Sequence, residues 1–176
     1  MKIEAWLIII FLAASRWSCH HPMSTEKIIV EVFFPNIIKD PNVEYKSYPV
    51  QRYIPRGVTL RDSIKFAIDE YLKGPTIAER EQGYYSAIPG KNEILSHKDY
   101  LRELCQWTDD DTIVTVKEVS ISGNNVFVLL SASSQAYGGG STRIEQMLGP
   151  LKQTVKFFLP SAEVGITAKC TEAFQP

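Results

Sequence analysis

Histidine is the side chain best suited to acid-base catalysis near neutral pH, and this 176-residue chain has three, at positions 20, 21 and 97. His20 and His21 follow Cys19 behind an apolar N-terminal run, and His97 stands near the start of a predicted helix. A nucleophile needs a base within reach and a group that orients the base. No Cys-x-x-Cys, His-Glu-x-x-His or nucleophile-elbow motif occurs. We therefore expect no catalytic residue, metal site or cofactor, and a protein that is not an enzyme.

The acidic residues fall at positions where solvent exposure is expected rather than a role in catalysis. Asp69 and Glu70 fall on the polar face of a predicted helix, and residues 109–111 are three aspartates in a predicted loop. The loop lacks the glycine and the spaced oxygen ligands of a calcium site, so a solvated turn is expected. A Gly-rich segment at 136–141 precedes a predicted helix without the Lys-Ser/Thr of a phosphate loop.

The composition fits one globular domain. Hydrophobic residues make up 44% of the chain and charged residues 22%, which is an ordinary balance for a domain with a core. The formal net charge is −1, so the charge balance favours neither nucleic acid nor an anionic membrane surface as a partner. No nucleic-acid partner is expected.

Residues 1–18 are predicted to be a secretory signal peptide. An apolar run from Ala5 to Ala14 is too short to span a bilayer permanently. Cys19 follows, at the position where a lipoprotein signal places its lipidated cysteine, although Arg16 stands where the lipobox has an aliphatic residue. On this interpretation residues 19–26 are a tether, and the protein is exported and membrane-anchored on the extracytoplasmic face, periplasmic or outer. The alternative is ordinary cleavage after Ala13-Ala14-Ser15, which leaves Cys19 as a free thiol.

The other two cysteines, Cys105 and Cys170, form a candidate disulfide. If Cys19 carries lipid, these two are left as a pair, and outside the cytoplasm such a pair can stay oxidised. The alternative is that Cys105 is a small apolar residue on its helix face and that Cys170 is unpaired.

The N-terminal half of the domain is predicted as strand, loop and helix. Lys27 to Phe34 is rich in β-branched and aromatic residues, which is typical of a strand, and 36–57 is a Pro-punctuated loop. Apolar residues then recur at helical spacing from Thr59, a suitable N-cap, to Gly74-Pro75, which ends the helix. A further loop separates this helix from Ser86.

The C-terminal half is predicted as a hairpin, a helix and a strand. The hairpin arms are 112–122 and 125–131, and the turn is Gly123-Asn124. Across the hairpin we expect one apolar set to face another: Val116, Val119 and Ile121 against Val126, Val128 and Leu130. The helix spans 142–159, with a kink or a fresh start at Pro150, and the last strand is 163–168.

Two short segments carry a resemblance to a known family. Leu72-Lys73-Gly74-Pro75 at the helix end and Ser86-Ala87-Ile88-Pro89-Gly90 after the loop resemble the GerMN module, the sporulation and spore-germination domain of bacterial envelope proteins. The resemblance implies an α+β fold and an interaction domain of an envelope assembly, without a catalytic constellation and with protein partners in the envelope.

One segment departs from that family. Residues 96–111 are predicted to be an inserted helix with Ser96 as its cap. With this insertion, the order β-α-β-β-α-β predicts an α+β fold, mainly one antiparallel sheet with two helices on one face. Residues 27–170 are the single GerMN-like domain, and 171–176 are a tail.

Two functions from different classes follow from these observations. The first is a membrane-tethered, non-enzymatic interaction or scaffold module, for which an exposed aromatic patch is expected; the candidate residues are Tyr84, Tyr85, Trp107 and Tyr137. The second is a cell-wall hydrolase or glycan-binding protein whose site is built by the insertion and the 36–57 loop.

The first testable prediction concerns the anchor. Cys19 should be the lipid-modified N-terminus of the native protein, because it follows a short apolar run at lipoprotein spacing. Intact mass spectrometry should show a diacyl or triacyl mass, since a single chain gives only marginal membrane binding. A mature N-terminus at Arg16, without added lipid mass, contradicts the prediction.

Overall fold

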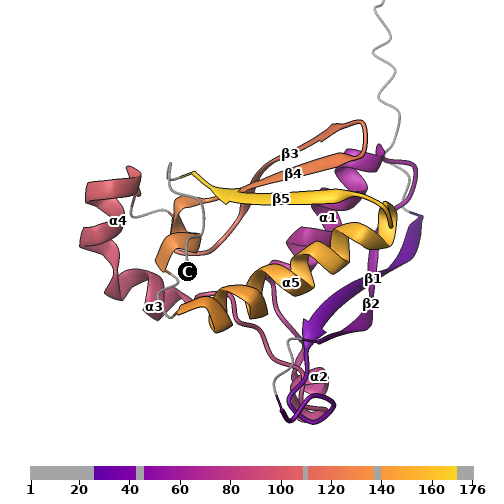
Figure 1. The fold of residues 1–176 in the computed structure, drawn as a ribbon, viewed down its shortest axis with the longest axis horizontal. Coiled ribbons are helices and arrows are strands. Elements are labelled where there is room, and N and C mark those ends of the chain that lie inside the picture. Colours follow the sequence, from indigo (N-terminus) through magenta and orange to yellow (C-terminus); the bar gives the residue numbers. More distant parts are fainter. Residues whose placement is uncertain (1–25, 43–45, 109–110, 137–139, 170–176) are drawn as a thin grey trace, which may run out of the picture.

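The computed structural model describes residues 26–42, 46–108, 111–136 and 140–169, which form two small sheets and two long helices (Figure 1). The predicted α+β class is confirmed. In chain order the elements are β1 (Lys27–Pro35), β2 (Ser47–Pro55), α1 (Leu60–Leu72), α2 (Ile77–Glu81), α3 (Lys91–Ser96), α4 (Lys98–Cys105), β3 (Val116–Ser122), β4 (Asn125–Leu130), the 3-10 helix η1 (Ala132–Ala136), α5 (Gly140–Phe158) and β5 (Glu163–Ala168).

Several predicted features lie outside the described residues. They are the signal peptide, Cys19 with His20 and His21, Tyr137, Cys170 and the tail 171–176.

The first sheet has the order β3-β4-β5. The predicted hairpin is confirmed: Val119 lies opposite Val128, and Gly123 has the positive φ, 59°, that its turn requires. β5 runs parallel to β4, so this sheet is mixed, whereas the other two strand pairings among the described residues are antiparallel, as the expected mainly antiparallel arrangement requires. The physical reason for the parallel pairing is α5, because a helix between the two strands returns the chain to the end of the sheet at which β4 begins, and β5 then runs in the same direction as β4.

The second sheet is the antiparallel pair β1-β2, and it corrects the prediction of a loop over 36–57. Val50 and Ile54 are buried at period-two spacing, but prolines obscure that alternation in the sequence. Pro49 lies opposite Phe33, whose backbone N–H points away from β2 and donates to Thr154 Oγ1 over 3.1 Å. This pair is therefore a non-hydrogen-bonded one, so the donor that Pro49 lacks is not needed by the ladder.

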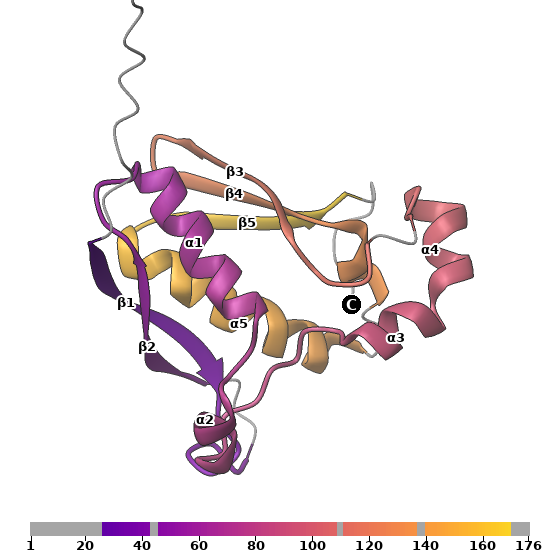
Figure 2. The same ribbon diagram turned by 180° about the vertical axis from the view of Figure 1, so that it is seen from behind.

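Helices α1 and α5 lie on one face of the three-stranded sheet and also pack against β1-β2 (Figures 1 and 2). One buried cluster joins side chains of both sheets and both helices. At its centre the Tyr71 hydroxyl donates to the Met147 carbonyl over 2.7 Å, and the ring centroids of Tyr71 and Phe34 are 5.3 Å apart. Thr59 is the N-cap of α1, as predicted, and accepts from the Asp62 N–H.

Helix α5 runs through Pro150 without starting afresh there. Thr154 Oγ1 donates to the Pro150 carbonyl over 3.0 Å and accepts from the Phe33 N–H over 3.1 Å. Thr154 is fully buried, and its hydroxyl provides the hydrogen-bond acceptor that the Phe33 N–H would otherwise lack on the side of β1 that faces α5.

The predicted inserted helix over 96–111 is two short helices, α3 and α4, that meet at His97. Ser96 belongs to the end of α3, and the expected Ser96 cap is wrong because α4 begins after His97 without a side-chain cap. α3 and α4 both contact η1. Ile94, Leu101 and Cys105 are buried there, so the insertion packs on the main core through one face.

Gly74 is expected to be costly to replace because its φ is +78°, in the left-handed region. Gly74→Ala should destabilise the protein by about 1 kcal/mol, with Gly74→Val at least as harmful. Thermal unfolding measures it. Gly149→Ala is the matched control, since Gly149 lies inside α5 without a positive φ and with open space around a Cβ, so alanine should not destabilise the helix there. Equal melting temperatures for the two alanine variants would contradict the prediction.

Cys105 of α4 is one half of the predicted disulfide. Cys105 is disulfide-bonded, and α4 and β5 both contact η1, so Cys105 lies on the side of the fold where β5 ends. We expect its partner to be Cys170, closing a loop of about 65 residues and stabilising the fold by roughly 4 kcal/mol at most. Peptide mapping without reductant should recover a fragment that joins Cys105 to Cys170. A bond to Cys19 would refute the pairing, and Cys19→Ser should leave the unfolding free energy unchanged.

Candidate binding groove

The described surface contains a groove of about 870 Å³, called here the motif groove. Its walls are the end of α1 with Gly74 and Pro75, the segment 85–91, and the segment 113–115 before β3; Arg80 of α2 lies at its rim. Both halves of the family-like motif, 72–75 and 86–90, therefore contribute to one surface. A volume of this size lies in the range of small-molecule and peptide sites.

The two halves meet because α1 ends at a left-handed glycine. The φ of +78° at Gly74 turns the chain sharply, and a Cβ built there would lie 3.7 Å from Ser86 Cβ. The segment from α2 to α3 passes beside the end of α1 (Figure 2). Pro75 and Pro89 are buried at this junction, and they stiffen the two walls.

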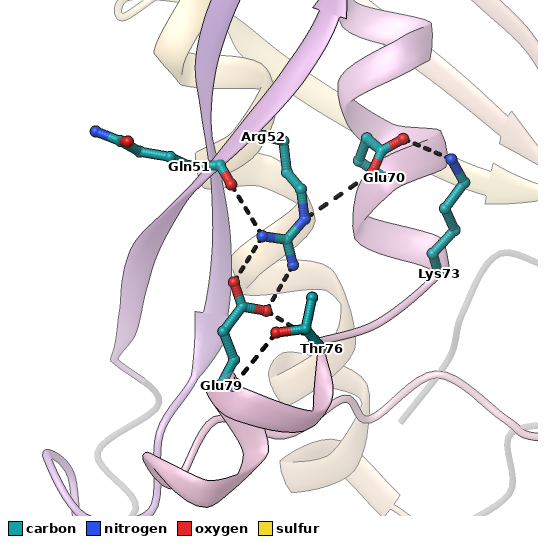
Figure 3. A network of polar contacts seen from close by, with 6 residues as sticks. All are labelled: Gln51, Arg52, Glu70, Lys73, Thr76 and Glu79. Atoms are coloured by element: carbon teal, nitrogen blue, oxygen red, sulfur yellow. Dashed lines mark hydrogen bonds and ion pairs between the residues drawn. The ribbon is translucent and has the colours of Figure 1, made fainter.

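A polar network centred on Arg52 of β2 fixes α2, which carries the chain between the two walls (Figure 3). Nη1 and Nη2 of Arg52 donate to the two carboxylate oxygens of Glu79 over 2.6 and 2.7 Å. Nη1 also donates to the Gln51 carbonyl over 2.9 Å, and Nε lies 3.9 Å from Glu70 of α1. The guanidinium packs 5.7 Å from the Phe34 ring centroid. Strand, core helix and α2 are thus joined through one cation.

Glu79 has a second role as part of the N-terminal cap of α2. Its carboxylate accepts from the Thr76 N–H over 2.8 Å, and Thr76 Oγ1 accepts from the Glu79 N–H over 3.3 Å. The hydrogen bonds from Arg52 lower the pKa of Glu79 below its ordinary value of 4.5; burial opposes this shift, and Thr76 assists it. The site therefore stabilises the carboxylate form, which is the opposite of what a general acid requires.

Asn36, just beyond β1, fastens the other end of α2. Its side-chain amide donates to the Gln82 carbonyl over 3.0 Å, and its Oδ1 accepts from the N–H groups of Ile38 and Lys39. The Tyr85 N–H donates to the Pro35 carbonyl over 3.1 Å. The wall at 85–91 is therefore attached to the end of β1 as well as to α2.

The predicted aromatic patch is wrong for two of its residues. Tyr84 is 6% exposed and its hydroxyl accepts from Lys39 Nζ over 2.8 Å; Trp107 is 4% exposed and donates from Nε1 to the Asp111 carbonyl over 2.7 Å. Both rings are buried because their polar atoms find partners within the fold. Tyr85 is half-buried and lines the motif groove, and burial, with a smaller contribution from Asp40, raises the pKa of its hydroxyl.

The charges of the motif groove divide into paired and unpaired groups. Asp69 accepts from Lys65 over 2.8 Å, and Glu70 pairs with Lys73 and with Arg52. Arg80 and Lys91 are exposed lining residues, and neither side chain has a carboxylate partner in the described part of the chain. The groove thus presents two available cations beside an apolar floor.

The described residues of the insertion and of the 36–57 segment, which were expected to build the alternative site, lie apart from one another. Residues 36–42 lie against α2, whereas α3 and α4 pack on η1 at another end of the molecule (Figures 1 and 2). Within the described residues no three His, Cys, Asp or Glu side chains gather to hold a metal ion. His97 Nδ1 lies 2.9 Å from the Glu93 carbonyl, a local contact between the two insertion helices.

Sequence reasoning missed α2 and the residues that hold it. The signal was present: Thr76 followed by Glu79 is the Thr-x-x-Glu spacing of a capping box, and that box is formed. Arg52 had no comparable signal, because nothing local in the sequence shows that an arginine on a strand faces inward toward Glu79.

The Arg52–Glu79 pair predicts a pH dependence of stability. The folded pKa of Glu79 is depressed, so the stability that it contributes is present above about pH 4.5 and is lost as the pH falls through the folded value. Glu79→Gln should therefore lower the unfolding free energy by about 1.5–3 kcal/mol at pH 7. The difference in unfolding free energy from the parent protein should narrow in acid.

Urea unfolding at pH 7 and at acidic pH measures both quantities. Glu81→Gln is the control, since Glu81 is an exposed acid on the same helix without an ion pair in the described structure. If the difference in unfolding free energy between Glu79→Gln and the parent protein does not change with pH, the charge of Glu79 is not what stabilises the site.

The chain was compared with known protein families, curated proteins and solved structures. A scan against protein-family models and searches of curated proteins and of solved structures found no match. None of the described helices combines the length and apolar character needed to cross a membrane.

Proposed function

We propose that this protein is a non-enzymatic interaction module of a bacterial cell envelope that holds a protein partner in the motif groove. The observation that carries the proposal is that the two segments of the GerMN-like motif, separated by residues 76–85 that include α2, line one open groove of about 870 Å³. The resemblance itself implies an interaction domain, and the groove is a surface on which such an interaction can take place.

The lining chemistry supports binding rather than turnover. Apolar side chains form much of the lining, and Ile113 is 60% exposed there, so a partner seated in the groove could cover it. The two groove acids, Asp69 and Glu70, are held in ion pairs with lysine and arginine. Carboxylates held in ion pairs of this kind suit structural or recognition roles.

Location belongs to the same proposal. The signal peptide and lipidation at Cys19 would export the domain and tether it to the membrane, with the folded part beginning close behind at β1. A partner in the same membrane or the adjoining envelope would then be met at high effective concentration, so modest affinity in the groove would be sufficient.

Site-specific photo-crosslinking tests this function. A benzophenone amino acid at position 113, in the full chain and in the cells that naturally make it, should give a discrete covalent adduct with an envelope protein. The same amino acid at position 156, an exposed lysine of α5 outside the groove, should not. Absence of an adduct at 113, with a folded and exported chain, would overturn the proposal.

A further inference from the structure

The motif groove has the features needed to recognise one chemical class of partner, and this inference rests on the proposed function. Its lining combines exposed cations without carboxylate partners in the described residues, an aliphatic and aromatic floor, and two segments that lie outside the named helices and strands. We infer that the groove binds an extended peptide segment of a partner, with acidic side chains that meet Arg80 and Lys91 and aliphatic side chains that cover the floor.

Charge complementarity is the first argument for an acidic segment. Around the groove, Asp69 is neutralised by Lys65, and Glu70 by Lys73 together with Arg52. Arg80 and Lys91 are left without a carboxylate in the described residues. A carboxylate from a partner would form charge-assisted hydrogen bonds there, and arginine can bind it with two parallel donors.

The floor gives the second argument, for aliphatic side chains between the acids. Phe66, Leu72, Ile88 and Ile113 line the groove, and none of the four is fully buried. Covering them would remove apolar surface from water. A polyanion without apolar groups, such as a phosphate polymer, would leave this floor exposed.

The backbone gives the third argument, for an extended conformation. The walls at 85–89 and 113–115 are not strands of either sheet. Among the groove residues that are not fully buried, Ser86 and Ile113 have backbone N–H groups that make no hydrogen bond in the described structure. An extended peptide can place its carbonyl groups against such donors while its side chains alternate between floor and rim.

Fluorescence polarisation with three labelled octapeptides tests the inference on the purified full chain. The first alternates glutamate and valine, the second lysine and valine, and the third glutamate and serine. We expect the first to bind at least tenfold more tightly than the other two, and its affinity to fall as salt is raised. The double variant Arg80→Ala/Lys91→Ala should weaken binding about tenfold, while Lys156→Ala, the control on α5, should not.

Several results would overturn the inference. They are equal binding of the basic peptide, equal binding of the glutamate-serine peptide, an unchanged affinity in the double variant, or displacement by heparin at concentrations that mark a general polyanion site. Arg80 and Lys91 are exposed, so the double variant should keep the parent melting temperature and remain interpretable. If an adduct forms at position 113 while the acidic peptide fails to bind, the interaction function stands and only the ligand class is wrong; loss of both results removes the function as well.

Discussion

The enclosure of the Arg52 guanidinium is the constraint on which the binding surface depends. The side chain is only 11% exposed, and a cation that has lost most of its water must be compensated by the protein. Glu79, the Gln51 carbonyl, Glu70 and the face of Phe34 together provide that compensation. These groups come from β1, β2, α1 and α2, so one side chain ties α2, which has no buried residue of its own, to elements that the core already holds.

Helix α2 shows why such a device is needed. It has five residues and no buried side chain, so neither intrinsic helix stability nor core burial can position it. Its cap, its ion pair with Arg52 and the Asn36 contact beyond its end do so instead. The chain leaves α2 already directed along the end of α1, and the groove wall at 85–91 follows from that direction.

The sequence predicted most of the features that local patterns decide. The apolar stripe and cap of α1, the Gly123 turn, and the facing valines of β3 and β4 are all local or short-range signals, and all were correct. Two local predictions failed, because the capping box of α2 was overlooked and Ser96 ends α3 rather than capping a helix. The other errors came where distant residues decide. β2 forms although prolines interrupt it, because its pairing with β1 does not require a donor at Pro49. Tyr84 and Trp107 were placed on the surface because burial of a polar aromatic depends on partners such as Lys39 and the Asp111 carbonyl that periodicity does not show.

The structural ion pair and the exposed cation of the groove are placed on neighbouring residues of α2. Successive helical side chains project about 100° apart, so when the carboxylate of Glu79 faces Arg52, Arg80 is directed elsewhere, and it lines the groove. The buried cation of the site, Arg52, is bound on several sides and cannot exchange partners without leaving a charge uncompensated. The exposed one, Arg80, has no carboxylate partner in the described structure and can form an ion pair without breaking another. A partner that engages Arg80 therefore has no structural ion pair to compete with, and changes at the rim can alter binding without loosening the fold.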